Sequence, residues 1–281
     1  MDMLIAESGS TKTEWRLCRD GEIVNSFRSR GFNPNVMPEE AIKSEIQALQ
    51  QNHLPEENIS RIFFYGAGTR GEAQNALMKG IFETIFPYAD VTIGYDLLAA
   101  VRSTGRSEGM VCILGTGSSA CLHSQGEIDE IRGGLGYLFG DEGSGADLGR
   151  SLIKAMLQGD LPDAVGNYVL EKEGMNLHDL KMAITRHPKP NVRMAVLAPF
   201  LREFLHLAEV FELVTGRFED FLSTTVCRFD NSGQLPLDVI GSVGYYFAGP
   251  FTQACENKKI TVGNFIKDPI EHLVNYHLRQ Q

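Results

Sequence analysis

The pattern of hydrophobic and polar positions predicts short strands that alternate with amphipathic helices through the first part of the chain. In the range 13–17, Thr13, Trp15 and Leu17 alternate with charged residues, as expected for a half-buried strand. The range 38–51 is a predicted helix, because Ile42, Ile46 and Leu49 fall on one face. The same two patterns predict strands at 4–6, 22–28, 61–65, 91–94, 111–114 and 119–123, and helices at 72–86 and 97–101. Strands and helices mixed in this way indicate an α/β fold.

The part of the chain from about residue 144 to residue 228 is predicted to be mostly helical. Its apolar spacing gives helices at 161–172, 177–185 and 199–213. In the last of these, one core face is expected from Phe200, Phe204, Leu207 and Phe211. A buried strand at 239–244 then runs into glycines, and a helix at 245–254, a strand at 259–265 and a helix at 269–279 follow.

Two turns rich in hydroxyl-bearing and small residues each separate a predicted pair of strands. The first is the range 8–12, Ser-Gly-Ser-Thr-Lys, and the second is the range 115–118, Gly-Thr-Gly-Ser. Such a turn can direct backbone N–H groups and hydroxyls at a phosphate, although a plain hairpin has the same pattern. The spacing of a Walker A loop is absent. The repeated order of strand, turn and strand suggests two similar halves, each with a phosphate-binding hairpin.

The range 133–150 contains seven glycines in eighteen residues, with Asp141 and Glu142 between them. Glycine allows positive φ and close approach of the backbone to a ligand, at an entropic cost. We therefore predict a tight loop that places the Asp141 carboxylate beside a polar ligand, followed by a helix from about Ser144. An ordinary glycine-rich connection would give the same composition.

Four further residues allow either a functional or a structural interpretation. Asp96 immediately precedes an apolar helix, where it is either a helix cap or a ligand-facing carboxylate. Asn33 could bind a ligand hydroxyl or cap its own backbone. Gly241 and Gly244 follow a buried strand, where they would admit a flat ligand or simply form a tight connection.

Composition and charge exclude several classes of protein. The chain has 281 residues, of which 43% are hydrophobic, and a net charge of −10, which argues against a nucleic acid or an anionic membrane as partner. The acidic N-terminus is unlike a signal peptide, and no apolar run has the length of a membrane span. Five cysteines without a CxxC pair predict reduced thiols and a cytoplasmic location. Seven histidines without metal-ligand spacing argue against zinc.

The ordered set of motifs resembles the sugar kinase, Hsp70 and actin superfamily, and more closely its branch of N-acetylglucosamine kinases and BadF/BadG-type ATPases. The range 7–13 resembles the first phosphate hairpin of that superfamily, and 114–118 the second. The range 133–144, Gly-Gly-Leu-Gly-Tyr-Leu-Phe-Gly-Asp-Glu-Gly-Ser, is similar to the signature of the branch. The range 240–244 is similar to the adenosine motif. The matches follow the order of the family and span most of the chain.

The resemblance implies two RNase-H-like (actin-like ATPase) domains that close on a nucleotide cleft. One would comprise residues 1–106 with the C-terminal helix 268–281, and the other residues 107–267. It further implies an ATP-dependent, Mg²⁺-assisted kinase for N-acetylglucosamine or a related amino sugar that forms a homodimer. Asp96 would be the general base, and Glu7 would orient Mg²⁺ through water. The sugar would contact Asn33, Asp96, Gly134, Leu135 and Asp141. The ATP site would comprise Gly9, Ser10, Thr11, Lys12, Gly115, Thr116, Gly117, Ser118, Gly241, Ser242 and Gly244.

The sequence departs from the family pattern at a few of these positions. Glu7 stands where the family usually has aspartate, and Leu135 where an aromatic residue often packs. Thr69 and Arg70 replace small polar residues expected near the acetamido group. Two other functions stay open. One is a BadF-type ATPase activator, which needs closely placed cysteines for an iron–sulfur cluster; the other is a non-catalytic sugar or nucleotide sensor.

Overall fold

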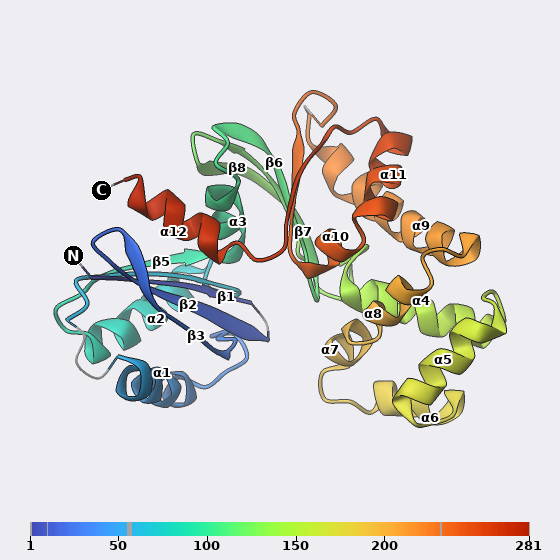
Figure 1. The fold of residues 1–281 in the computed structure, drawn as a ribbon, viewed down its shortest axis with the longest axis horizontal. Helices are drawn as coiled ribbons and strands as arrows, with labels where there is room; N and C mark the ends of the chain where they lie inside the picture. Colours follow the sequence, from blue (N-terminus) through green and yellow to red (C-terminus); the bar gives the residue numbers. More distant parts are fainter. Residues whose placement is uncertain (1, 10, 55–57, 231, 281) are drawn as a thin grey trace. The chain divides into compact units, whose positions relative to one another are not determined.

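The computed structural model describes residues 2–9, 11–54, 58–230 and 232–280. The chain divides into two compact units (Figure 1). Unit 1 comprises Met1–Arg106 and Asp268–Gln281, and unit 2 comprises Ser107–Lys267. No helix in the described ranges is long and apolar enough to cross a bilayer.

Unit 1 is a five-stranded sheet in the order β3-β2-β1-β4-β5 with helices on both faces. The pairs β1–β2 and β2–β3 are antiparallel, and β1–β4 and β4–β5 are parallel. Leu4 and Ala6 pack into one core with residues of α1 and α2, whereas Met3 and Ile5 pack with residues of α3 and α12. The elements are β1 (Met3–Ser8), β2 (Lys12–Arg19), β3 (Glu22–Arg30), α1 (Glu39–His53), β4 (Arg61–Gly66), α2 (Glu72–Ile85), β5 (Asp90–Tyr95), α3 (Asp96–Thr104) and α12 (Ile270–Leu278).

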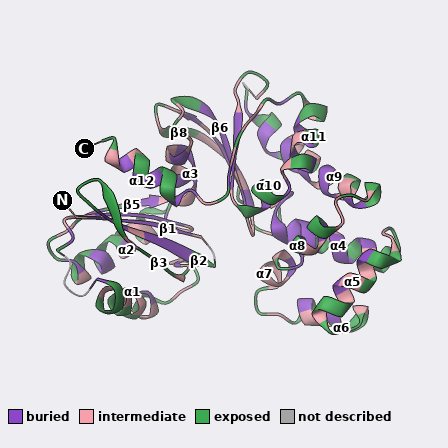
Figure 2. Ribbon diagram, viewed as in Figure 1, coloured by how far each residue is buried: buried purple, intermediate pink, exposed green. Residues whose placement is uncertain are grey.

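Unit 2 repeats this strand order in its own sheet, β10-β9-β6-β7-β8, with the same pattern of antiparallel and parallel pairs. Its strands are β6 (Glu108–Leu114), β7 (Ser118–Ser124), β8 (Glu127–Gly133), β9 (Leu237–Ile240) and β10 (Val262–Ile266). Its helices are α4 (Gly145–Gln158), α5 (Asp163–Glu173), α6 (Leu177–Thr185), α7 (Pro190–Ala195), α8 (Ala198–Glu203), α9 (Ala208–Thr224), the 3₁₀ turn η1 (Val226–Arg228), α10 (Ser242–Tyr246) and α11 (Ala248–Lys258). Burial is concentrated in the central strands of both sheets, whereas α1 is largely exposed (Figure 2).

The prediction of one helix at 199–213 is wrong. The chain forms two helices, α8 and α9, and Leu207 between them has extended backbone angles. This break lets Leu201 on α8 and Val210 on α9 both enter the core, whereas Phe200 and Phe204 are only partly buried against it. Tertiary burial therefore overrides a regular helical spacing.

Two other boundaries near the C-terminus differ from those predicted. The expected helix at 245–254 is interrupted at Phe247, which separates α10 from α11. The expected strand at 259–265 begins later, at Val262, because Lys259 adopts a left-handed conformation that ends α11. The strand β8 was not predicted; it is a half-exposed strand with charged residues at many of its positions.

Candidate functional site

Three parallel strands of unit 1 bring predicted site residues to one edge of its sheet. Ser8 at the end of β1 pairs with Gly66 at the end of β4, which pairs with Tyr95 at the end of β5. Glu7 and Asp96 therefore lie at the carboxyl ends of strands. In open α/β sheets, ligands bind at this edge, where neighbouring connections diverge.

Glu7 and Asp96 form a pair of half-buried carboxylates at this edge. Asp96 is the first residue of α3, and its Oδ1 accepts a hydrogen bond from the Leu97 backbone N–H at 2.9 Å. Burial raises the pKa of Asp96, while Arg70 opposes this rise. Burial raises the pKa of Glu7 to about 7; the charge of Lys12 lowers it and that of Asp96 raises it. The pair therefore favours a nearby cation or hydroxyl donor.

The first hydroxyl-rich turn is held by hydrogen bonds on both sides. Within it, the Gly9 N–H donates to the Lys12 carbonyl at 2.9 Å; Ser10 lies outside the described residues. Ser8 Oγ accepts from Thr13 Oγ1 at 2.8 Å and from the Phe32 N–H at 2.9 Å. Ser8 thus fixes the turn to the loop that carries Asn33, a link that sequence reasoning missed.

Asn33 caps its own loop, and that loop packs on the connection after β4. Asn33 Oδ1 accepts from the Asn35 N–H at 2.9 Å, and Asn35 Nδ2 donates to the Gly68 carbonyl at 3.1 Å. A Cβ on Gly68 would lie 2.3 Å from Asn33 Oδ1, so glycine is required for this approach. The side-chain oxygen is therefore committed to the backbone.

Thr69, which we expected near an acetamido group, is buried. Its hydroxyl lies 2.7 Å from the Gly66 carbonyl oxygen and 2.6 Å from that of Gly94. It joins the ends of β4 and β5 just before Asp96. The hydroxyl is therefore used to hold the sheet edge together.

Lys12 is engaged in ion pairs with two carboxylates. Its Nζ lies 2.7 Å from Asp268 Oδ1 and 3.0 Å from Glu14 Oε1. Glu14 is buried and also pairs with Arg28 and Arg16. The sequence indicated a role for Lys12 but for neither carboxylate. Asp268 is 256 residues away, and Glu14 has the pattern of an ordinary charged residue in a strand.

In unit 2 the second hydroxyl-rich turn and the glycine-rich segment are packed together. The Ser118 N–H lies 3.4 Å from Asp141 Oδ1, and Ser118 Oγ donates to the Glu142 carbonyl at 2.7 Å. The Gly134 N–H donates to the Ser118 carbonyl at 2.9 Å. A Cβ on Gly117 would lie only 2.9 Å from Asp141 Oδ2. Residues predicted to bind phosphate are thus in contact with residues predicted to bind the sugar.

Asp141 occupies an uncommon backbone conformation, with φ of 62°. Few residues other than glycine adopt this region, and aspartate is among those that tolerate it. Burial raises the pKa of Asp141, while the N–H groups of Ser118 and Gly136 oppose the rise. The carboxylate is therefore presented by a constrained loop, as is typical of functional positions.

The remaining residues of the second turn contact the start of α4. The N–H of Gly145 donates to the Gly115 carbonyl at 2.8 Å, and that of Ala146 to the Thr116 carbonyl at 3.2 Å. These bonds occupy N–H groups that would otherwise be unpaired in the first turn of a helix. They fix the turn on α4.

Asp147 is a buried residue of this region that sequence reasoning missed. It accepts hydrogen bonds from the Gly143 N–H at 2.9 Å, from Arg217 Nε at 2.7 Å and from Arg150 Nη2 at 2.5 Å. Ser144 caps α4 by accepting from the Asp147 N–H. A serine followed three residues later by an acidic residue is a recognisable cap signal and could have identified it. Asp147 thus anchors the end of the glycine-rich loop.

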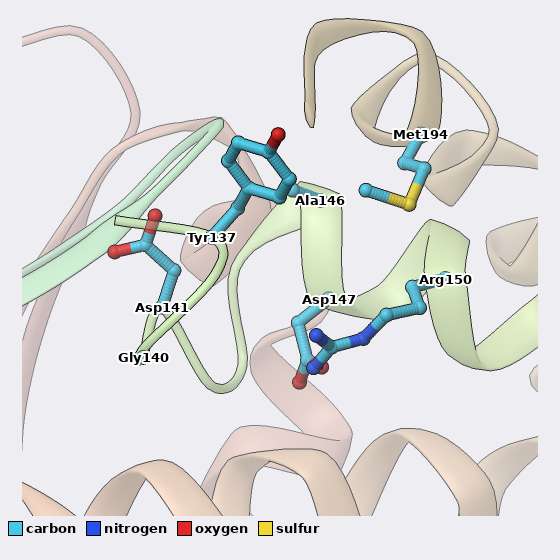
Figure 3. A pocket seen from close by; sticks show the side chains of 7 residues that line it. All are labelled: Tyr137, Gly140, Asp141, Ala146, Asp147, Arg150 and Met194. Carbon is cyan, nitrogen blue, oxygen red and sulfur yellow. The ribbon is translucent and has the colours of Figure 1, made fainter. Parts of the chain in front are cut away.

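A shallow pocket of about 160 Å³ lies beside this loop (Figure 3). Arg150 turns toward Asp147, whereas the Asp141 carboxylate points away from that pair (Figure 3). The lining residues are Tyr137, Gly140, Asp141, Ala146, Asp147, Arg150 and Met194. Leu135, predicted to contact the sugar, is 65% exposed on the same loop.

The glycines after β9 lie against the strand that leads into the second turn. Gly241 has φ of 107°, and a Cβ there would lie 2.6 Å from the carbonyl oxygen of Leu114, the last residue of β6. A Cβ on Gly244 would lie 2.3 Å from Val239 Cγ1. Both glycines are required by packing, and Ser242 between them is exposed.

The cysteines do not form a cluster site. Cys112 and Cys121 are buried on neighbouring strands, where Val111 is the residue opposite Cys121. Their sulfurs therefore lie on opposite faces of the sheet. Among the residues that the structure describes, no three or more His, Cys, Asp or Glu side chains are grouped so as to hold a metal ion.

Comparison with solved structures defines the class of protein. A Streptomyces griseus glucokinase of the ROK family, solved with glucose and AMPPNP, shares the fold over the whole of both chains, with a TM-score of 0.60 at 15% identity. A Chromobacterium violaceum protein, provisionally named N-acetylglucosamine kinase, has a TM-score of 0.73 at 20% identity over 98% of each chain. The predicted α/β fold with two actin-like domains is thus confirmed as that of the sugar kinases.

A nearer relative shows the family. A Porphyromonas gingivalis protein, also provisionally named N-acetylglucosamine kinase, is 33% identical over 99% of both chains, with a TM-score of 0.94. The chain belongs to this N-acetylglucosamine kinase family, as the motifs predicted.

Curated relatives match over a shorter range. The glucosamine kinase GspK of Vibrio cholerae is 27% identical, and the N-acetylmuramic acid/N-acetylglucosamine kinase of Clostridium acetobutylicum is 25% identical. The chain spans about half the length of each, 53% and 52%. No family model matches the chain.

Proposed function

We propose that this protein is an ATP-dependent kinase that phosphorylates a hydroxyl of N-acetylglucosamine or a related amino sugar. The observation that carries the proposal is the contact of Asp141 with Gly117 and Ser118. A carboxylate suited to binding sugar hydroxyls there meets a turn suited to binding phosphate. Phosphoryl transfer needs this juxtaposition, because acceptor and phosphate must be held within reach of each other. Membership of the kinase family supports the proposal.

Asp96 is the proposed general base. The sugar hydroxyl would give its proton to the Asp96 carboxylate while its oxygen forms a bond to the γ-phosphorus. The bond from that phosphorus to the oxygen bridging to the β-phosphate would break, and ADP would leave. The raised pKa of Asp96 makes its carboxylate a better proton acceptor than an ordinary aspartate.

The other proposed roles follow the loops described for each unit. In unit 1, Gly9, Ser10, Thr11 and Lys12 would contact the β- and γ-phosphates, and the loop of Asn33 would contact the sugar. In unit 2, the sugar would contact Gly134, Leu135 and Asp141. The remaining nucleotide contacts would come from Gly115, Thr116, Gly117, Ser118, Gly241, Ser242 and Gly244.

Glu7 is suited to help hold Mg²⁺. Burial raises the pKa of its carboxylate, and the negative charges of Asp96, Asp268 and Glu14 add to that rise. A cation would relieve this repulsion, and Mg²⁺ usually binds one or two carboxylates, several waters and substrate phosphates. When bound, Mg²⁺ would neutralise phosphate charge. Glu7 would act on the metal through water.

A panel of acceptors identifies the substrate. ADP release would be measured with glucose, glucosamine, N-acetylglucosamine, N-acetylmannosamine and N-acetylmuramic acid. We expect turnover that requires an amino sugar, with the highest kcat/KM for N-acetylglucosamine. ATP hydrolysis equally fast without any sugar would instead support an ATPase activator, and ATP binding without turnover would support a sensor.

Asp96→Asn tests the base. This variant should lose at least about 100-fold in sugar-dependent kcat while it still binds ATP. Asp90→Asn is the matched control, because Asp90 is exposed at the other end of the same strand. A wild-type rate in Asp96→Asn would show that the base assignment is wrong.

A further inference from the structure

The Lys12–Asp268 ion pair joins the first hydroxyl-rich turn to the segment in which the chain returns to unit 1. Asp268 Oδ1 lies 2.7 Å from Lys12 Nζ. Asp268 follows β10, the last strand of the sheet of unit 2, and precedes α12. Asp268 lies two residues after the last strand of its sheet, and Asp96 directly follows the corresponding strand of the other sheet. No sequence motif had indicated a role for Asp268.

Glu14 fixes Lys12 from the other side. Glu14 is buried, and its Oε1 accepts from Lys12 Nζ at 3.0 Å and from Arg28 Nε at 2.7 Å. Its Oε2 lies 3.5 Å from Arg16 Nη1, and Arg16 Nε donates to Glu271 of α12 at 2.7 Å. Glu14 is therefore an immobilised acceptor, and the start of α12 supports the same strand.

The two carboxylates leave Lys12 with one directed donor. An ammonium group carries three N–H donors and no acceptor. Among the described residues, Asp268 and Glu14 take two of them. The third is left for an oxygen of a ligand, and its direction is set by the other two. An unrestrained lysine would instead distribute its charge over many rotamers.

Folding stability does not account for this pair. The side chains of Lys12 and Asp268 are 46% and 37% exposed. Ion pairs this exposed contribute little to stability, because solvent screens them and ordering the side chains costs entropy. What the pair does accomplish is to fix the position of a positive charge on a turn suited to phosphate.

We propose that Asp268 is a positioning residue that holds the Lys12 ammonium in place for the β- and γ-phosphates of ATP. This rests on the proposed function, which assigns Lys12 to those phosphates. Asp268 itself does not contact the nucleotide in this proposal; it acts through Lys12. Preorganised charge of this kind stabilises phosphates without the cost of ordering the side chain on binding.

The test compares nucleotide binding and turnover in Asp268→Asn. Calorimetry should show ATP binding weakened about fivefold and adenosine binding unchanged. In the ADP-release assay, the KM for ATP should rise by a larger factor than kcat falls. In a Lys12→Met background, Asp268→Asn should have no further effect. Asp268→Glu, which keeps the charge, should lie nearer to wild type. Glu271→Gln is the control, because it loses an ion pair from the same segment to Arg16 but not to Lys12.

Two results would overturn the proposal. One is wild-type ATP affinity in both Asp268 variants, and the other is an equal loss of ATP affinity with and without Lys12. A failure of the proposed kinase function can be distinguished from a failure of this proposal. If wild-type protein shows no sugar-dependent ADP release while Asp268→Asn still weakens ATP binding only when Lys12 is present, the kinase function is wrong and the positioning of Lys12 holds.

Discussion

At the scale of single residues, Glu7 is the position where the chain departs most plainly from the pattern of its family. Glu7 is the next-to-last residue of β1, its carboxylate interacts with Lys12 and Asp96, and burial raises its pKa to about 7. A glutamate places the charge further from the backbone than an aspartate would. Whether the site needs the longer side chain can be tested directly.

Glu7→Asp should keep turnover at or above the wild-type level, because the carboxylate remains and the family geometry is restored. Glu7→Gln should lower Mg²⁺-dependent turnover by about tenfold or more, since a neutral amide loses the charge that orients the metal and its waters. Both are measured as ADP release against Mg²⁺ concentration at fixed ATP and sugar. A collapse of Glu7→Asp would show that the surroundings have adapted to the longer side chain.

The residues that could be chosen from the sequence were those with a local signal. Asp141 has a glycine-rich context and Asp96 precedes a helix, and the structure places both on constrained loops or helix starts. Glu14, Asp147 and Asp268 had no such context or only a faint one. Their importance comes from partners distant in sequence, which no local pattern reveals.

At the scale of elements, the strands were predicted better than the long helical stretch. Central strands such as β1 and β6 are buried on both faces, so a short apolar run identifies them. Strand β8 was not predicted, because charged residues interrupt its apolar positions. The break between α8 and α9 could not be seen, because the spacing of apolar residues continues across it.

The crossing of α4 and α7 depends on a glycine. A Cβ on Gly149 would lie 1.9 Å from the Met194 carbonyl oxygen. Gly149→Ala should therefore destabilise unit 2 by about 2 to 3 kcal/mol, since backbone has to move. Far-UV circular dichroism in urea would measure the loss.

Gly216→Ala on α9 is the matched control, because a Cβ there meets nothing within 4 Å. It should raise the stability of the same unit by up to about 1 kcal/mol through helix propensity. Equal effects of the two substitutions would show that the close approach of α4 to Met194 is wrong.

At the scale of the whole molecule, two units with the same strand order each carry one hydroxyl-rich turn at the end of their first strand. The two similar strand–turn–strand segments indicated this repetition from the sequence. The homodimer expected from the family stays a prediction. Unit 1 is completed by α12, which packs on β1 and β4 through Ile270, Leu273 and Val274.

His277 on α12 makes the stability of unit 1 dependent on pH. It is buried, stacks on Phe63 at 3.8 Å between ring centroids, and lies 2.8 Å from Tyr65 Oη. Burial, together with the charges of Arg102 and Arg61, lowers its pKa from 6.5 to about 4. Between these values only the unfolded chain takes up the proton. Stability should therefore be full above pH 6.5 and fall by up to about 3 kcal/mol as the pH drops toward 4.

His277→Gln should remove most of this dependence, whereas His272→Gln, on the exposed side of the same helix, should keep it. The fluorescence of Trp15, the single tryptophan of the chain, reports on unit 1 in urea titrations between pH 4.5 and 7.5. An unchanged slope in His277→Gln would show that another group titrates.

The return of the chain to unit 1 has a consequence for how the protein is made on the ribosome. Unit 2 is continuous, so it can fold once residues up to Lys267 have emerged. The first part of unit 1 precedes unit 2 in the chain but lacks α12 until residues up to Leu278 have emerged, so the side of β1 with Met3 and Ile5 is only partly covered meanwhile. Unit 1 is therefore the first unit to be translated and the last to be completed. During that interval it is the part of the chain most in need of a chaperone.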